Sequence, residues 1–253
     1  MESIAELKRI CRRENYEDNK KTMLLAARVS IYFTKLFLSM NLSANQVTYI
    51  FISLGILSAA AFLGHGLKWL IAGYMLHRLH VICDVSDGEV ARYRKTFSAQ
   101  GAYLDYLAHY LIYALILFSI ATRLYIDTGQ VSALFTGFIL VLANTMNRAA
   151  CDCWFRANFG KSSRSDIEEG TGSEKRVKVP AWKKFAVLTF AHLSSVQTFL
   201  NLYLLTALTL VFLHIDLRLE LFKFYALILT AFSSGRIYLT IKRGKIPRRA
   251  SYY

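Results

Sequence analysis

The sequence predicts an all-α protein whose helices cross a membrane several times. Of its 253 residues, 55% are hydrophobic, and the mean hydropathy of +0.33 is high for a soluble domain of this length. The Lys and Arg residues behind the formal net charge of +14 stand in short blocks between long apolar stretches. This arrangement is typical of a polytopic membrane protein whose loops contact anionic headgroups, and it argues against nucleic-acid binding.

The first 44 residues form the N-terminal cytoplasmic or interfacial segment of this predicted single domain. Residues 1–22 are polar and charged, without the apolar core and cleavage site of a removable signal peptide. Apolar residues recur at helical spacing through residues 23–40, but Arg28 and Lys35 interrupt them. Because each charge costs about 3 kcal/mol near the bilayer centre, we expect an amphipathic helix at the interface, with a true span as the alternative.

Residues 45–243 are predicted to form the transmembrane bundle, with residues 244–253 as a cytoplasmic tail. About six spans are expected, at residues 47–63, 69–85, 103–124, 131–155, 182–213 and 219–241. Each stretch is long enough to cross the hydrocarbon core together with its flanking residues. We see no internal repeat and no second domain in the sequence.

The distribution of basic residues predicts the orientation. If both ends are cytoplasmic, the inside segments are the N-terminal block and residues 92–95, 156–184 and 242–249, all of which are rich in Lys and Arg. The outside loops then hold little beyond Lys68, Arg123 and Arg218. The excess of positive charge favours a cytoplasmic location for the first set. Residues 158–180 are expected to form a long solvated connection on that side.

The residues that suggest chemistry lie where the second predicted span ends and the third begins. Two sets share helical faces: Asp84, Asp87, Gly88 and Ala91 on one helix, and Gly101, Asp105 and His109 on the next. Three facing carboxylates would repel one another unless a cation held them, and such oxygen-rich sites suit Mg²⁺ or Mn²⁺. The small residues leave room for a bulky ligand, and Arg92 can bind a phosphate oxygen.

The alternative is that these carboxylates cap helices or pair with Arg92, Arg94 and Lys95. Capping or ion pairing could explain any one of these Asp residues. It does not explain why all of them fall on inward helix faces, because ionisable groups on inward faces of membrane helices are costly and are usually functional.

The pattern D-x2-D-G-x2-A-R-x8-G-x3-D resembles the signature of the CDP-alcohol phosphatidyltransferase family. Seven of its eight positions match, and His109 stands where the family has its last Asp. The stretch Ser43-Ala44-Asn45-Gln46-Val47-Thr48 is also similar to the start of the family's first span, where a Pro often replaces Ala44.

The resemblance implies a six-helix fold, a CDP-linked donor, an alcohol acceptor, a divalent metal, release of CMP and commonly a homodimer. Carried over position by position, it makes Asp84, Asp87 and Asp105 metal ligands. It places the nucleotide and its phosphates against Gly88, Ala91, Arg92 and Gly101, and the cytidine near Asn45 and Thr48.

His109 is the departure from the pattern, because the family's Asp is proposed as the general base. A neutral imidazole can accept a proton near neutral pH. Two alternatives remain open: His109 as a metal ligand or a neighbour of one, and His109 as a mark of lost or altered activity.

Two arginines within apolar spans, Arg148 and Arg236, suggest a binding pocket for a phosphate or an anionic headgroup. An Arg in such a position normally faces the protein interior or a cavity; the alternative is that its side chain extends to the interface.

The sequence therefore predicts a membrane transferase that moves a substituted phosphate from CDP-diacylglycerol or another CDP-linked alcohol to an alcohol, with the active site facing the cytoplasm. The alternatives are a hydrolase that cleaves the same donor with water, and a non-catalytic membrane protein that binds nucleotide or lipid.

Overall fold

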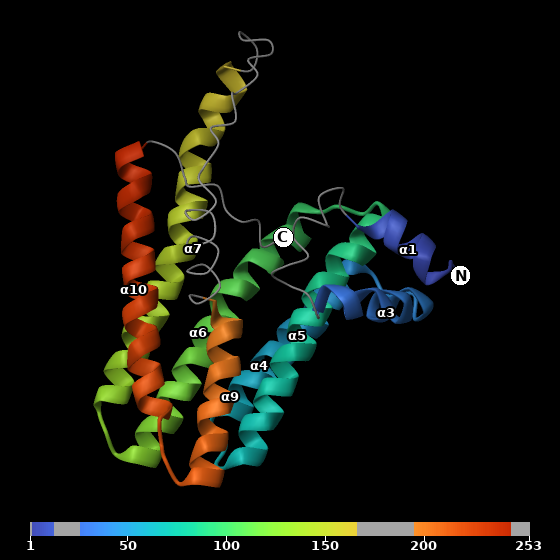
Figure 1. The fold of residues 1–253 in the computed structure, drawn as a ribbon. Helices are drawn as coiled ribbons and strands as arrows, with labels where there is room; N and C mark the ends of the chain where they lie inside the picture. The colour runs from blue at the N-terminus through green and yellow to red at the C-terminus, as the bar shows by residue number, and fades with distance from the viewer. Residues whose placement is uncertain (1, 13–25, 166–194, 244–253) are drawn as a thin grey trace.

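The computed structural model describes residues 2–12, 26–165 and 195–243. These residues form eight helices and no strand: α1 (Ile4–Cys11), α3 (Ala26–Ser39), α4 (Ala44–Phe62), α5 (Leu67–Arg94), α6 (Ala99–Thr128), α7 (Ser132–Ser165), α9 (Val196–Leu213) and α10 (Arg218–Arg243) (Figure 1). The predicted all-α class is confirmed.

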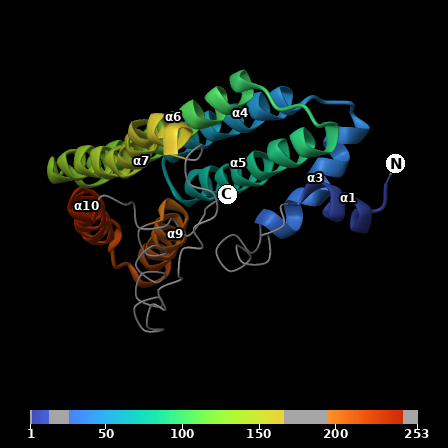
Figure 2. The ribbon, with the colours of Figure 1, turned by 90° about the horizontal axis from the view of Figure 1, so that it is seen from above.

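Helices α4 to α7, α9 and α10 run lengthwise beside one another, whereas α1 and α3 lie across one end of α5 (Figures 1 and 2). Helix α4 packs between α5 and α6, and α7 packs between α6 and α10. Helix α9 contacts α10 and α5. We call the end of the bundle where α5 ends and α6 begins the motif end, and the other end the distal end.

Five of these helices are long and apolar enough to cross a membrane: Ala44–Phe62, Ala99–Thr128, Ser132–Ala157, Val196–Leu213 and Arg218–Lys242. They correspond to five of the six expected spans and support an integral, polytopic membrane protein. The sixth expected span, residues 69–85, lies in α5, which has 28 residues but is not among the five. Arg78 and Asp84 make α5 more polar, so this crossing stays a prediction.

The first turn of α4 begins earlier than the apolar run because of a capping box. The Ser43 hydroxyl accepts from the Gln46 backbone N–H, and the Gln46 side chain accepts from the Ser43 N–H. At the far end of α5, Lys95 adopts a left-handed conformation, with φ 53°, that ends the helix. Ser98 then caps α6 by accepting from the Gly101 N–H. These caps set the positions of the three helices that form the site.

The expected connection over residues 158–180 begins as helix rather than as loop, because α7 continues to Ser165; its solvated, cytoplasmic location stays a prediction. The loss of apolar character near Arg156 marks a change of environment rather than the end of the helix. The rest of that connection, residues 166–180, lies outside the described residues, as do residues 182–194 of the fifth expected span.

The expected amphipathic helix at residues 23–40 corresponds to α3, with residues 23–25 outside the described part of the chain. One face of α3 is buried, including Ser30, Ile31 and Thr34, while Tyr32 and Leu36 are exposed. The buried face, which includes two hydroxyl side chains, packs on the bundle, and the exposed face carries apolar side chains, so the place of α3 at the membrane interface stays a prediction.

Helices α4 and α6 approach each other closely at Gly55. A Cβ atom at this position would lie 2.7 Å from the Ile112 side chain of α6, which is fully buried. Ile112 belongs to the main apolar core, together with Phe51 of α4 and Ile116 of α6. Only glycine therefore permits this helix separation without a shift of the neighbouring side chain.

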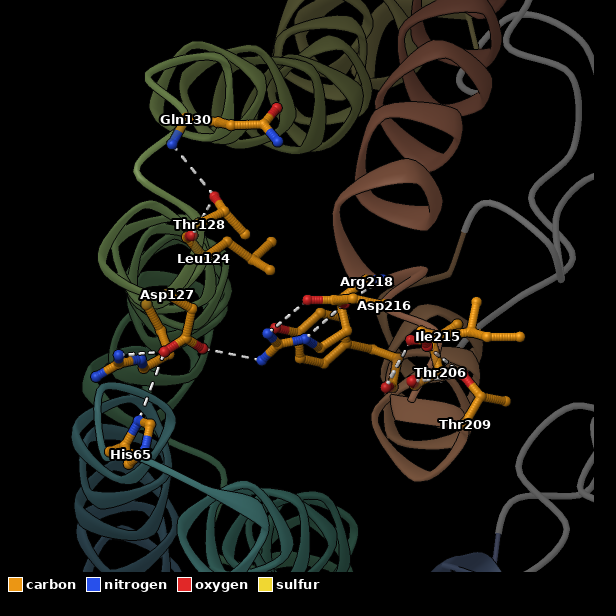
Figure 3. Close-up of polar contacts among 12 residues, drawn as sticks. His65, Leu124, Asp127, Thr128, Gln130, Thr206, Thr209, Ile215, Asp216 and Arg218 are labelled. Atoms are coloured by element: carbon orange, nitrogen blue, oxygen red, sulfur yellow. Dashed lines mark hydrogen bonds and ion pairs between the residues drawn. The ribbon is translucent and has the colours of Figure 1, made fainter. Parts of the chain in front are cut away.

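At the distal end, a cluster of charged residues connects three parts of the chain (Figure 3). Asp127 of α6 accepts hydrogen bonds from Arg123 and, at 2.9 Å, from Arg218 of α10. Arg218 also donates to Asp216 at 2.8 and 2.9 Å. His65, in the α4–α5 connection, has its Nδ1 3.5 Å from Asp127 Oδ1. We call these five residues the Asp127 cluster.

Candidate active site

Three of the four predicted acidic and imidazole side chains meet at the motif end. Asp84 of α5 and Asp105 and His109 of α6 each offer a ligand atom, and these atoms all lie within 4.8 Å of one another. His109 Nε2 is 3.4 Å from Asp84 Oδ1 and 3.3 Å from Asp105 Oδ1. We call these residues the carboxylate–histidine group. The i, i+4 spacing on α6 and the crossing of α5 beside it bring them together.

This group is largely shielded from solvent. The side chain of His109 is 4% exposed, that of Asp84 11% and that of Asp105 31%. Asp105 Oδ1 is buried and accepts no hydrogen bond from the described residues. Within the described part of the chain, no Lys or Arg forms an ion pair with either carboxylate. Two such carboxylates repel each other, so the site favours a positive charge between them.

The donor set fits a divalent metal. Two carboxylate oxygens and one imidazole nitrogen within 4.8 Å suit Mn²⁺, and the oxygens suit Mg²⁺ completed by water or phosphate. Asp105 Oδ1, which accepts no hydrogen bond and lies 3.3 Å from His109 Nε2, is the kind of atom that a cation would satisfy.

Asp87, the third predicted metal ligand, lies beside this group but outside it. Its Oδ2 accepts a hydrogen bond of 2.8 Å from the Thr48 hydroxyl of α4. Thr48, expected near the cytidine, is buried, and its Oγ1 also lies 3.1 Å from the Ala44 carbonyl oxygen, which competes for the same hydrogen. Its hydroxyl therefore orients a carboxylate of the signature, a contact that the sequence pattern did not predict.

Asn45 and Gly101 meet where α4 begins beside α6. A Cβ atom at position 101 would lie 2.8 Å from Asn45 Oδ1 and 3.1 Å from Ser98 Oγ. A larger residue at position 101 would therefore force the Asn45 side chain to move, even without a bound nucleotide. The two predicted nucleotide-binding positions are brought together by the fold.

Gly88, Ala91 and Arg92 follow on the last turns of α5. A Cβ atom at position 88 would lie 3.2 Å from Arg92 Nη1, so the guanidinium lies against Gly88. Arg92 Nε donates to the Cys11 carbonyl at the end of α1. Ala91 contributes its carbonyl, which accepts from the Thr96 N–H where α5 ends. The predicted contacts of these residues with phosphate stay predictions.

Aromatic rings hold His109 in place. The ring of Tyr113 is nearly parallel to it, at 7° and 6.1 Å between centroids, and Phe51 of α4 lies at 6.4 Å and 29°. A second histidine, His80 of α5, lies next to Phe51. Its Nδ1 is 2.8 Å from the Phe51 carbonyl oxygen, and because a carbonyl can only accept, His80 Nδ1 carries the hydrogen. The role of Tyr113 was missed, although its position four residues after His109 places it on the same face.

Of the two predicted phosphate-binding arginines, Arg148 is the nearer to this group. Its guanidinium carbon is 5.1 Å from the centroid of the Tyr113 ring, and its charge acts favourably on Asp84. Arg236 of α10 donates from Nη1 to Asn147 Oδ1 of α7 at 3.0 Å. Arg148 thus lies beside the residues that hold His109, whereas Arg236 connects α10 with α7.

The fold and the site define a helical, polytopic membrane protein with a shielded group of metal-ligand type where two helices meet. The model of the CDP-alcohol phosphatidyltransferase family matches residues 41–233, and the chain belongs to this family. The match covers α4 to α7, α9 and most of α10, and it includes the whole Asp84–His109 stretch. A search of the curated proteins finds no match to the chain. The family is one of phosphotransferases that act on CDP-linked donors, typically with a divalent metal.

Proposed function

We propose that this protein transfers a substituted phosphate from a CDP-linked donor to an alcohol and releases CMP, as a step in phospholipid or related phosphodiester synthesis. The donor is CDP-diacylglycerol or a CDP-linked polar alcohol. The observation that carries the proposal is the carboxylate–histidine group, which lies in the family-matched region at the positions of the signature.

In this proposal Asp84 and Asp105 hold Mg²⁺ or Mn²⁺, and Asp87, oriented by Thr48, completes the ligand set. The bound cation supplies positive charge against the diphosphate of the donor. Asn45 and Gly101 line the nucleotide side of the site, while Gly88, Ala91 and Arg92 approach the phosphates. Arg148 supports the acceptor or donor phosphate from the side of Tyr113, and Arg236 is assigned the same role from α10.

The transfer itself is a displacement at phosphorus. The oxygen of the acceptor hydroxyl forms a bond to the transferred phosphorus, and the bond from that phosphorus to the CMP oxygen breaks. His109 accepts the proton of the hydroxyl, with its ring held between Phe51 and Tyr113. The short distances from His109 Nε2 to Asp84 and Asp105 support a metal-ligand role as the second assignment for this side chain.

Alcohol-dependent CMP release tests the proposal. Purified protein in lipid nanodiscs would be incubated with Mg²⁺, labelled CDP-diacylglycerol or a labelled CDP-linked polar alcohol, and a panel of alcohols. We expect CMP release only with a suitable alcohol, together with a new phosphodiester. Release without any alcohol would identify a hydrolase, and donor binding without release would identify a non-catalytic protein.

Variants of His109 separate its assignments. If His109 is the base, His109→Ala loses about 100-fold in turnover but still binds CDP with Mn²⁺, and His109→Asp, which restores the family's residue, keeps substantial activity. Loss of Mn²⁺ binding in His109→Ala, measured by electron paramagnetic resonance, would make it a ligand. Activity in His109→Asp but not in the natural sequence would show that the natural site is inactive.

We also propose that the motif end faces the cytoplasm and that the protein forms a homodimer. Arg92, Arg94 and Lys95 lie at the motif end, which supports this orientation. An impermeant thiol label on a cysteine introduced at Lys95 should react only from the cytoplasmic side, and one introduced at Gly129 only from the outside.

The proposed homodimer is tested by mass photometry. Nanodisc-free protein in detergent should give twice the chain mass.

A further inference from the structure

Helix α3 departs from the pattern of a water-facing amphipathic helix, because it buries hydroxyl groups and exposes large apolar side chains. Ser30 and Thr34 are fully buried. Their hydroxyls donate to the carboxylate of Glu89 on α5, at 3.0 and 2.6 Å. Tyr32 and Leu36, by contrast, are 58% and 51% exposed. This pattern indicates that the exposed face of α3 meets an apolar layer rather than water alone.

The exposed apolar side chains of α3 share one face with two cations. Arg28, Tyr32, Lys35 and Leu36 recur at i, i+4, i+7 and i+8, and Met40 continues this row just after the helix. Arg28 is exposed, Lys35 is partly exposed, and Met40 is 59% exposed. We call these five residues the outer face of α3. Neither this face nor the rest of the helix contains an Asp or Glu.

The two cations of the outer face have no acidic partner within the part of the chain that the structure describes. None of the ion pairs there includes Arg28 or Lys35. At the distal end, by contrast, Arg123 and Arg218 share Asp127. The charge of the outer face is therefore available to an anionic partner, and the apolar side chains between the cations suit a partner that also offers an apolar layer. An anionic lipid leaflet offers both, since its headgroups lie directly above its acyl chains.

The place of α3 in the bundle agrees with a leaflet as this partner. Helix α3 lies across the motif end of α5 rather than along the bundle, so it runs in the plane of a membrane that the bundle spans (Figures 1 and 2). Its hydrogen bonds reach Glu89, five residues or about 7.5 Å along the helix before α5 ends at Arg94. The basic residues Arg92, Arg94 and Lys95 follow directly. The outer face therefore lies at the level where headgroups replace acyl chains.

We propose that the outer face of α3 binds the anionic headgroups of the leaflet at the motif end. Arg28 and Lys35 contact lipid phosphates, while the apolar side chains of the face enter the boundary between headgroups and acyl chains. Because the buried hydroxyls of α3 bond Glu89, the lipid composition of this leaflet sets how firmly α3 is held against the turns of α5 that carry the signature. Such binding requires no transfer reaction, so it stands apart from the proposed function.

Amide hydrogen exchange in α3 tests the proposal, with the full-length protein in nanodiscs of phosphatidylcholine alone or mixed with phosphatidylglycerol. We expect exchange in α3 to be about tenfold slower with the anionic lipid, because two cations then hold the helix on the leaflet. High salt should remove most of this difference. The double variant Arg28→Gln with Lys35→Gln should abolish the difference, and Arg28→Glu with Lys35→Glu should reverse its sign. The matched control, Lys68→Gln with Lys223→Gln, removes two cations near the distal end and should keep the difference.

Equal exchange of α3 in the two kinds of nanodisc would overturn the proposal and would mean that the outer face meets only acyl chains. Exchange in detergent that slows with protein concentration, without anionic lipid, would also overturn it, because a second copy of the chain would then cover the face. Slower exchange with phosphatidylglycerol that persists in Arg28→Gln with Lys35→Gln would exclude these two cations as the contacts. A protein whose α3 responds to the lipid but which releases no CMP would end the proposed function and support this proposal.

Discussion

Helix α6 carries an aspartate near each end, and the two have opposite surroundings. Asp127, at the distal end, accepts hydrogen bonds from Arg123 and Arg218. Asp105, at the motif end, faces Asp84 and His109, and the described residues place no Lys or Arg in an ion pair with it. The same residue type on one helix thus has a neutralised and an unneutralised environment.

The difference separates a structural carboxylate from a binding one. At the distal end, Arg123 and Arg218 supply the positive charge that compensates Asp127, so this carboxylate needs no bound cation. At the motif end, the neighbouring carboxylates repel each other, and in the proposed metal site a bound cation would offset that repulsion and stabilise the folded state. An unneutralised acidic group in a membrane protein is therefore a better indicator of a site than an acidic residue as such.

The largest expected effect is the loss of activity when the motif-end carboxylates are neutralised. Asp84→Asn, Asp87→Asn and Asp105→Asn should each reduce CMP release at least about 100-fold, because each change removes a ligand charge at the diphosphate. The proteins should remain folded by size-exclusion chromatography. Full activity in all three would remove the metal-site assignment.

The corresponding change at the distal end should affect stability instead. Asp127→Asn leaves Arg123 and Arg218 without their shared carboxylate, and we expect it to lower the free energy of unfolding by roughly 1–3 kcal/mol. CMP release per folded molecule should stay at the level of the natural sequence. Thermal unfolding in detergent measures the first quantity, and a large loss of activity without loss of stability would contradict the contrast.

Metal removal should change the stability by a similar amount, through the motif end alone. Excess Mg²⁺ should raise the unfolding temperature of the natural protein, since a ligand at about 100 times its Kd stabilises by about 2.7 kcal/mol. EDTA should reverse that shift. Asp127→Asn should keep the Mg²⁺-dependent shift and Asp84→Asn should lose it. An equal shift in both variants would mean that the ion binds elsewhere.

The smallest expected effect is a pH dependence at the distal end. Hydrogen bonds from Arg218 lower the pKa of Asp216, which lies between α9 and α10. A carboxyl with a lowered pKa stabilises the folded state above its unfolded value of about 3.9, and this contribution is lost as the pH falls through the lowered pKa. Asp216→Asn should therefore be less stable than the natural protein at pH 7, with the gap closing below about pH 4. A gap that does not change with pH would exclude this cause.

The sequence predicted the residues whose relation depends on helical spacing alone. Asp105 and His109 share a face because they are four residues apart, and a short connection places Asp84 on the neighbouring helix. It did not predict that Thr48 would bond Asp87, or that Ser30 and Thr34 would bond Glu89. Those contacts depend on how far α3 and α4 are rotated and shifted along α5, which no local pattern encodes.

The ends of the helices likewise include one that a local sequence pattern explains and one that the sequence did not predict. The capping box at Ser43 and Gln46 is a local pattern that explains why α4 begins before its apolar run. By contrast, hydropathy follows the surroundings of a helix rather than its hydrogen bonds. The fourth predicted span, residues 131–155, agrees with the apolar segment Ser132–Ala157, but hydropathy did not predict that α7 continues to Ser165.

The close approach of α4 and α6 at Gly55 has a consequence for how this site can be redesigned. Gly55 lies seven residues after Thr48, and Ile112 lies seven after Asp105, so the contact is about 10 Å deeper than the site on both helices. Gly55 sets the separation of α4 and α6 at this depth. The Cβ atom of an alanine there would lie 2.7 Å from the Ile112 side chain and would push the two helices apart. The separation of α4 and α6 at the proposed site can then change without altering any of the residues proposed to bind substrate, so this buried glycine is a position at which the choice of acceptor alcohol could be tuned.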